Sequence, residues 1–490
     1  MRRLLFYLLA GWLCCLTGCM DDESYTLSPN DVLVFSRDTL SFDTVFSGQP
    51  TNTYTFEVYN PADKAIRIPE IRLEQGAASP YRVNVDGTFL EGGTAGGFEI
   101  AARDSMRVFL FLHPRDEDSD LPVACHDRLV FRTEAGVESA VELLGYGQSV
   151  YRLKGLVVKT DTLLASARPF QVLDSLVVAP GATLTLAPGT RLYFHADAGM
   201  RVDGTLWAVG TLEEPVLMRG DRLGNMFTEQ SYDAIPGQWQ GVTFGESSYD
   251  NYLSYCDIHS GTYGLRLDSC DMSRTKLEME NSIVHNVVGH AIEARSARLF
   301  VGNSQVTNAG GDCLHLRGGH YTFVHCTVGN FYPFAGGKGV ALDFSNIDGE
   351  IRLPVEQLAF VNSILTGSSS DEIMGYQSDR YTEDAFRYIF MNCLLNTPEV
   401  EDAGYVNPTW DKDEETAREK NFLPAHDLDK LIFPFTLHPA SRAVGIADTE
   451  WTAAYYPNDR LGRPRLTDGK ADAGCYEAEP LPEEESNPAQ

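Results

Sequence analysis

The amino-acid sequence predicts an all-β chain, in which a β-sandwich precedes a long stack of short parallel strands. Toward the N-terminus, short runs of alternating polar and apolar residues are separated by turns that contain Pro and Gly, as in antiparallel sandwiches. In the middle of the chain, a similar phrase begins at Asn281, Asn303 and His325, with a step of 22 residues. A repeat this short cannot enclose a core of its own, so successive copies must stack on one another.

The repeats predict which residues become neighbours in the stack. Each short strand reads apolar, variable, apolar, charged, which is typical of a strand with one buried face. Because stacked parallel strands lie about 4.8 Å apart, like positions should form columns of close neighbours. The variable positions form an exposed column of Arg266, Glu293 and His315. With a four-residue insertion at 333–336, the charged positions form a second column of Asp268, Arg295, Arg317 and Asp343.

A third column with the same step contains Asn286, Asn308 and Asn330. Stacked side-chain amides can donate and accept hydrogen bonds along such a column, so we expect a structural asparagine ladder at a turn. The alternative is three separate asparagines, each of which favours a turn.

Small Cys and Ser side chains share a column that should fill the interior of the stack. Its members are Cys256, Ser282, Ser304, Cys326, Ser363 and Cys393. We therefore expect buried free thiols rather than disulfides. No spacing among the cysteines indicates a metal site, and neither a metal nor a cofactor is expected.

From about Val157 to Asn396, these repeats resemble the right-handed parallel β-helix proteins of the pectin-lyase-like superfamily. The resemblance implies a right-handed parallel β-helix over residues 151–396. Among β-helix glycosidases, the polygalacturonases carry four catalytic motifs, of which this chain keeps only one Asp, in Gly311-Asp312-Cys313. The resemblance therefore supports the fold and assigns no catalytic residue.

Both flanks of the repeats also resemble known domains. The phrases at 58–61 and 144–147 are similar to immunoglobulin-like domains of the abnormal-spindle and Hydin type. This similarity implies an N-terminal immunoglobulin-like β-sandwich over residues 19–150, with a spacer role. Toward the C-terminus, the phrases at 459–465 and 472–477 resemble the closing motif of β-helix proteins of the choice-of-anchor type. We therefore expect a C-terminal closing region over residues 397–477. A disordered acidic tail is expected over residues 478–490.

The first residues predict an address in the cell envelope. Residues 1–18 combine Arg2 and Arg3 with a short apolar run, and Cys19 follows small residues. This pattern resembles the bacterial lipobox, which implies a lipoprotein signal peptide and lipidation of Cys19; the alternative is an ordinary signal with an incidental Cys. The acidic cluster at 20–23 resembles a surface-export signal, although a solvated linker has the same composition. We expect an outer membrane lipoprotein, surface-exposed and held to the membrane through its lipid.

Charge restricts the partners. The chain has 69 acidic and 39 basic residues, a formal net charge of -30, which makes nucleic acid a poor partner. A polysaccharide is the expected partner, bound by a glycan-binding or adhesive scaffold; the alternative function is a glycan-cleaving enzyme of the polysaccharide lyase type. The candidate glycan-binding stripe consists of Arg266, Glu293, Arg295, His315 and Arg317. The alternative for this stripe is a set of ion pairs between adjacent coils, Asp268 with Arg295 and Arg317 with Asp343.

Overall fold

The computed structural model describes residues 24–227, 229–411 and 419–479. The chain divides into two compact units, Met1–Ser149 and Val150–Gln490, which we call the N-terminal and C-terminal units. The predicted signal peptide, Cys19, the acidic cluster and the residues from 480 onward lie outside the described residues. Within the described ranges, no helix combines the length and apolar character needed to cross a membrane.

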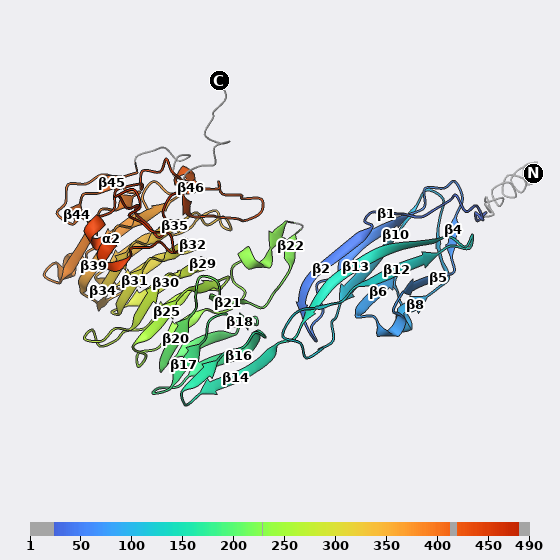
Figure 1. Ribbon diagram of the computed structural model, residues 1–490, viewed down its shortest axis with the longest axis horizontal. Coiled ribbons are helices and arrows are strands. Elements are labelled where there is room, and N and C mark those ends of the chain that lie inside the picture. The colour runs from blue at the N-terminus through green and yellow to red at the C-terminus, as the bar shows by residue number, and fades with distance from the viewer. Residues whose placement is uncertain (1–23, 228, 412–418, 480–490) are drawn as a thin grey trace, which may run out of the picture. The chain divides into compact units, whose positions relative to one another are not determined.

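The N-terminal unit consists of two sheets that share one apolar core (Figure 1). The first sheet contains β1 (Val34–Phe35), β3 (Tyr54–Tyr59), β10 (Ser105–Leu112), β6 (Tyr81–Val85) and β7 (Thr88–Phe89). The second contains β11 (Val123–Ala124), β13 (Glu138–Gln148), β12 (Asp127–Arg132), β5 (Glu70–Leu73), β8 (Thr94–Ala95) and β2 (Thr39–Phe46). A short pair is made by β4 (Ile66–Ile68) and β9 (Phe98–Ile100). The predicted arrangement of alternating strands in two sheets is confirmed for this unit.

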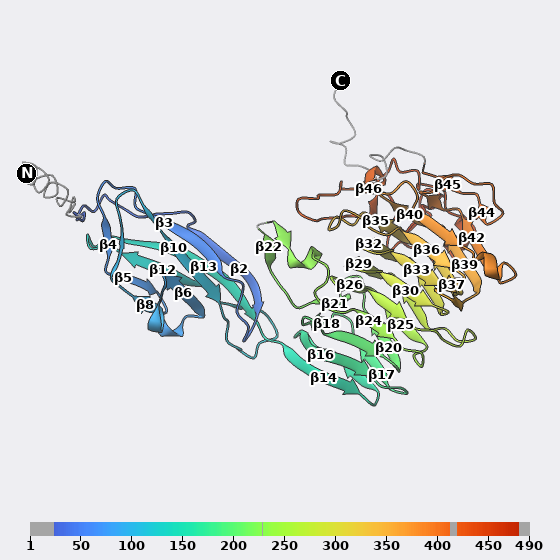
Figure 2. The same ribbon diagram turned by 180° about the vertical axis from the view of Figure 1, so that it is seen from behind.

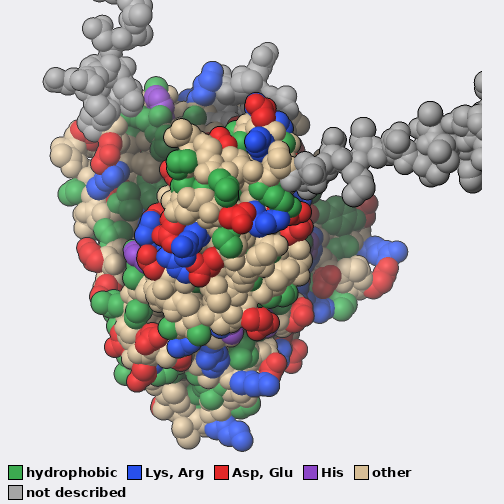
Figure 3. Space-filling model, turned by 90° about the vertical axis from the view of Figure 1, so that its right-hand side faces the viewer, with side chains coloured by type: hydrophobic (Ala, Val, Ile, Leu, Met, Phe, Trp, Pro, Cys, Tyr) green, Lys and Arg blue, Asp and Glu red, His purple; other side chains and the backbone are tan. Residues whose placement is uncertain are grey.

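Alternation of side chains explains why these strands form a two-layered unit. In β10, every second residue from Met106 to Leu112 is buried, so one face lies in the core and the other in solvent. Exposed Arg side chains on this unit lie beside carboxylates, as in the pairs Arg128–Glu142 and Arg107–Glu57. On the face shown in Figure 3, basic and acidic side chains are interspersed in the same way.

The C-terminal unit is built from three parallel ladders, each of which receives one strand per coil (Figure 2). At its start, β14 (Tyr151–Val158) pairs with β16. The first ladder contains β16 (Phe170–Val178), β19 (Gly199–Val202), β24 (Val242–Phe244), β27 (Leu265–Leu267), β30 (Ile292–Arg295), β33 (Leu314–Arg317), β36 (Leu342–Ser345) and β41 (Ile373–Tyr376). The second contains β18 (Arg191–Phe194), β21 (Val216–Gly220), β26 (Cys256–His259), β29 (Ile283–Val287), β32 (Gln305–Ala309), β35 (Thr327–Asn330), β40 (Ile364–Gly367), β43 (Leu394–Leu395) and β45 (Thr409–Trp410).

The third ladder forms a separate sheet of ten strands. It contains β15 (Thr162–Leu164), β17 (Thr183–Leu186), β20 (Thr205–Val209), β25 (Asn251–Ser254), β28 (Leu277–Glu280), β31 (Arg298–Gly302), β34 (Gly319–Val324), β39 (Val355–Val361), β42 (Phe386–Met391) and β44 (Tyr405–Val406). Short antiparallel pairs leave the stack at β22 (Asn225–Phe227) with β23 (Gln230–Ser231), β37 (Ile347–Asp348) with β38 (Ile351–Arg352), and β46 (Phe422–Leu423) with β47 (Thr436–Leu437). The stacked strands continue past the predicted boundary at 396. This arrangement is compatible with a parallel β-helix.

The predicted Cys and Ser column lies inside the stack. The Ser282 hydroxyl accepts a hydrogen bond from the Cys256 backbone N–H at 3.0 Å, and the Ser363 hydroxyl accepts one from Cys326 at 3.0 Å. All three thiols of the column are free and fully buried, which confirms the prediction; they are Cys256, Cys326 and Cys393. The hydroxyls provide acceptors for backbone N–H groups where the chain turns between ladders.

Among the described residues, the predicted column of Asn286, Asn308 and Asn330 forms no amide-to-amide hydrogen bond, since Asn330 Nδ2 donates to the Gly311 and Gly339 carbonyls. Asn286 and Asn308 occupy equivalent positions with φ near +50°, but Asn308 Oδ1 accepts from the Phe331 N–H instead of a stacked amide. The amide-to-amide bond lies where the repeat begins, since Asn303 Nδ2 donates to Asn281 Oδ1 at 2.7 Å. Asn tolerates the left-handed conformation that this turn requires.

The predicted register of the exposed columns is correct for the three coils that contain β27, β30 and β33, and wrong for the next coil. Arg295 lies beside Arg317 as expected. Leu342, however, aligns with Leu314, so Asp343 lies beside His315 and not beside Arg317. The insertion between these coils is therefore two residues longer than predicted.

A C-terminal segment covers part of the second ladder. Its apolar residues, including Phe422, Phe435 and Tyr476, pack on Phe331 and Ile364 of the stack. The two phrases of the predicted closing motif lie together here, because Arg465, which is fully buried, pairs with Glu477 at 2.8 Å. The same segment contains α2 (Thr449–Tyr455), whose N-cap Asp448 accepts from the Trp451 N–H.

Candidate functional site

The outward face of the second ladder changes in character along the stack. One outward column runs Asp257, Ile283, Gln305, Thr327 and Ile364. Its neighbour runs His259, His285, Thr307, Gly329 and Thr366. Gly329 and Ile364 lie where the C-terminal segment packs on the ladder, whereas Asp257, His259 and His285 lie on earlier coils. The ionisable part is therefore available for chemistry.

A cavity of about 470 Å³ opens at this transition. Its floor is the second ladder, with Asp257, His285, Gln305 and Thr307. One wall is the loop that follows β23, and the opposite wall is the C-terminal segment from Lys430 to Thr436 together with Tyr476. The two walls touch, since Gln230 Nε2 donates to the Asp429 carbonyl at 3.0 Å. The cavity thus depends on three parts of the chain that are far apart in sequence.

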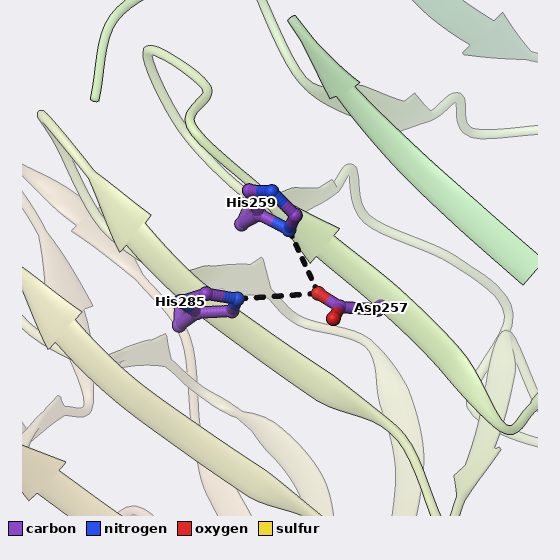
Figure 4. A group of neighbouring side chains, drawn as sticks. All are labelled: Asp257, His259 and His285. Carbon is purple, nitrogen blue, oxygen red and sulfur yellow. Dashed lines mark hydrogen bonds and ion pairs between the residues drawn. The ribbon is translucent and has the colours of Figure 1, made fainter. Parts of the chain in front are cut away.

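Asp257 holds two histidines from adjacent coils. Asp257 Oδ1 lies 2.8 Å from His259 Nδ1 and 3.2 Å from His285 Nε2. The three side chains point toward one another from β26 and β29 (Figure 4). The two imidazole rings are 4.6 Å apart between centroids.

A second carboxylate completes the hydrogen bonding of His259. Asp233 Oδ1 lies 3.1 Å from His259 Nε2 and is paired with Arg219. Asp233 belongs to the short 3-10 turn Tyr232–Ala234, whose N-cap Ser231 accepts from the Asp233 N–H. On the inner side, Trp239 Nε1 donates to the His259 carbonyl at 2.8 Å. Trp239 is 1% exposed and stacks on Phe194, so its role is structural.

The carboxylates fix the charge of this cluster. Burial lowers the pKa of His259, but the charges and hydrogen bonds of Asp257 and Asp233 outweigh it and raise that pKa to about 9. Burial raises the pKa of both carboxylates, but His259 outweighs it, lowering the pKa of Asp233 to about 2 and that of Asp257 well below its usual value. The two carboxylates therefore favour the protonated form of His259.

The predicted glycan-binding stripe lies on the first ladder, outside this cavity. Arg266 Nε pairs with Glu293 Oε2 at 2.9 Å. Arg317 reaches diagonally to Asp343, with an N–O distance of 2.5 Å. Arg295 pairs with Asp348 and not, as predicted, with Asp268. All three arginines of the stripe are therefore paired with carboxylates.

His315, the remaining residue of the stripe, belongs to a second cluster. Asp312 Oδ2 lies 2.8 Å from His315 Nδ1 and 3.3 Å from His290 Nδ1, and the two rings stack at 4.0 Å. The backbone N–H of Asp312 donates to His290 Nδ1. Arg317 Nη2 lies 3.3 Å from His315 Nδ1. Although burial raises the pKa of Asp312, its contacts with the two histidines and the hydrogen bond that it accepts from the Val340 N–H hold that pKa below its usual range.

Sequence reasoning missed the Asp257 cluster. The signal that could have revealed it is the repeat itself, because extending the phrase at Asn281 by one coil places His259 in the column of His285. The contribution of Asp233 and Arg219 has no such signal, since Asp233 lies in a loop outside the repeat.

Comparisons with known proteins assign no family. No family model matches the chain. A stretch of 82 residues is 35% identical to Protein bark beetle of Drosophila melanogaster, and it covers 17% of this chain and 3% of that protein. The chain thus matches only a small part of that relative. Among solved structures, the ASH / PapD-like domain of human CEP192 (PapD-like domain 7) is 11% identical with a TM-score of 0.17, covering 27% of this chain and 96% of that domain.

Proposed function

We propose that the protein is an outer membrane lipoprotein that binds a glycan in the cavity on the second ladder. In this proposal, the C-terminal unit is a right-handed parallel β-helix of the pectin-lyase-like type, closed by a choice-of-anchor-type motif. The N-terminal unit is an immunoglobulin-like spacer, and lipidated Cys19 holds the chain to the membrane. The observation that carries the proposal is the cavity, because it combines a polar floor with one largely apolar wall, formed by residues 431–435.

Both kinds of surface suit a saccharide. A cavity of about 470 Å³ lies in the size range of small-ligand sites, about 300–1,000 Å³. The floor offers carboxylate, imidazole, amide and hydroxyl groups that can bond to sugar hydroxyls. Phe433 and Ile432 line the opposite side, and Ile432 is 52% exposed. Apolar side chains of this kind can pack against the C–H face of a sugar ring.

The charges of the cavity favour a neutral glycan over an acidic one. Three carboxylates line it, from Glu229, Asp233 and Asp257, against a single lysine, Lys430. Lys430 itself lies 3.8 Å from Asp427. A uronate carboxylate would therefore enter a site of its own sign. The proposed ligands are therefore neutral hexoses or N-acetylated sugars.

The test is a glycan array with the full chain, followed by calorimetry with the strongest ligand. Phe433→Ala should weaken binding by about two- to tenfold, because an aromatic contact contributes about 0.5–1.5 kcal/mol. Trp207→Ala is the matched control, since Trp207 is an aromatic side chain of the third ladder that is 49% exposed. Equal loss in both variants, or loss in the control alone, would place the glycan elsewhere. An array without any bound glycan contradicts the proposal.

A glycan-cleaving enzyme is the second candidate, and the Asp257–His285 contact is the observation that favours it. A carboxylate that holds one imidazole nitrogen orients the ring so that the other nitrogen can act as a base. His285 lines the cavity, so its second nitrogen could reach a bound sugar. A lyase also needs a group that neutralises the uronate, and Arg219 is already paired with Asp233. New unsaturated or reducing ends during incubation with glycans would select this candidate.

A further inference from the structure

We infer that Asp257, His259 and His285 form a binding site for a divalent transition-metal ion, with Zn²⁺ as the reference ion. The inference concerns the cavity of the proposed glycan site but does not depend on glycan binding. Two imidazoles and one carboxylate are ligands that Zn²⁺ prefers, and three protein ligands with an open position are typical of reactive zinc sites. In this chain, the three donor atoms all lie within 4.8 Å of one another.

The distances between the donors suit one ion. Zn²⁺ binds nitrogen and carboxylate oxygen at about 2.0–2.2 Å in a tetrahedron, which places neighbouring donors about 3.4 Å apart. Asp257 Oδ1 lies 3.2 Å from His285 Nε2, close to that value, and 2.8 Å from His259 Nδ1. The ion would take the place of the proton between Asp257 and His259. Their two atoms need to separate by only a few tenths of an ångström.

The surroundings of His259 match those of a metal ligand. A metal-bound histidine usually donates its other ring N–H to a carboxylate, which fixes the tautomer and the ring orientation. Asp233 Oδ1 occupies this position at 3.1 Å from His259 Nε2, and Arg219 holds Asp233. The His259 carbonyl is fixed from the inner side by Trp239. His259 is therefore oriented before any ion arrives.

The cavity supplies access and further polar groups. Asp257 and His285 both line it, so an ion on these ligands would have its open positions directed to a space that water or a sugar hydroxyl can fill. Asn286 also lines the cavity and is 5% exposed. Its Oδ1 has no hydrogen-bond partner among the described residues, which is unusual for a buried amide and points to a missing ligand.

The cluster of His290, Asp312 and His315 has the same residue types but lacks these properties. His290 Nδ1 already accepts the Asp312 N–H, so its lone pair is occupied. Arg317 places a guanidinium 3.3 Å from His315 Nδ1, where it repels a cation. The chain therefore contains its own matched control for the metal site.

The test is titration of the full chain with Zn²⁺ after dialysis against a chelator, with Co²⁺ absorption as a second readout. We expect a single equivalent of Zn²⁺ per chain and a visible band from Co²⁺ in a site with nitrogen ligands. His285→Ala should abolish both, while His315→Ala in the second cluster should change neither. Asp233→Asn should weaken Zn²⁺ binding about 10–100-fold, as expected for loss of a carboxylate that orients a ligand.

Three outcomes would overturn the inference. They are no stoichiometric uptake by the parent chain, unchanged affinity in a folded His285→Ala variant, and loss of uptake in His315→Ala. If His285→Ala fails to fold, His285→Gln keeps the size and polarity of the side chain and should show the same loss. Glycan binding is measured separately on the metal-free chain, so the metal site and the proposed function can each fail alone.

Discussion

Replacing Arg295 and Arg317 by Gln tests whether the glycan binds in the cavity or on the stripe. The two arginines lie on adjacent coils and pair with Asp348 and Asp343. If these contacts are ion pairs that only keep the surface soluble, the double variant should bind the glycan as the parent chain does. If a bound sugar needs both guanidinium groups, binding should disappear.

The structure limits the cost of this change in stability. The Arg295–Asp348 side chains are 41% and 46% exposed, so this pair contributes about 0.2–1 kcal/mol. The Arg317–Asp343 side chains are 16% and 29% exposed, and this less hydrated pair contributes about 1 kcal/mol. The sum is at most about 2 kcal/mol. Since 1 kcal/mol shifts the melting temperature of a large domain by about 2–4 °C, the variant should remain folded at room temperature.

The assay is calorimetric titration of the parent chain and the double variant with the same glycan, together with thermal melting of both. We expect equal affinity and a melting temperature lower by a few degrees. If the double variant loses binding although its melting temperature falls by only a few degrees, the glycan binds on the stripe and not in the cavity. A much larger loss of stability would show that the two ion pairs contribute more than about 2 kcal/mol to the free energy of unfolding.

Three further predictions concern the anchor, the interior and the C-terminal segment. Cys19→Ala should leave a chain that no longer partitions into detergent, and membrane fractionation of this variant in high salt would contradict the lipobox. Because burial raises the pKa of Cys256 and Cys393 to about 12, the interior thiols should resist alkylation in the native protein and react after denaturation, as counted by mass spectrometry; rapid native labelling would contradict the register. Gly302→Ala places a Cβ 1.7 Å from the Tyr456 hydroxyl, so chemical unfolding should reveal a loss of about 1–3 kcal/mol, and an unchanged midpoint would mean that Tyr456 does not pack there.

The strict repeat made much of the C-terminal unit predictable. A constant step of 22 residues fixes the neighbours of Asn281, Asn303 and His325, and period-2 alternation fixes the buried face of each strand. The same alternation explains the error at Asp343. A slip of two residues keeps apolar residues inside and charged residues outside, so the pattern cannot distinguish the correct register from its neighbour.

The candidate site was less predictable, because only its floor belongs to the repeat. Asp257, His259 and His285 follow from the alignment of coils once the functional column is known. Asp233 lies in an irregular loop, and the wall that contains Phe433 is contributed by a segment whose position depends on packing against the second ladder. Contacts between segments that are far apart in the sequence produce no periodic pattern from which they could be predicted.

A crystal structure of the full chain with the glycan selected by the array would locate the glycan-binding site directly. If the glycan binds in the cavity, difference density for a sugar should appear there, in contact with Phe433 on one side and with polar groups of the second ladder on the other. Density over the first ladder at Arg266 and Arg317, or on the N-terminal unit, with an empty cavity would contradict binding in the cavity.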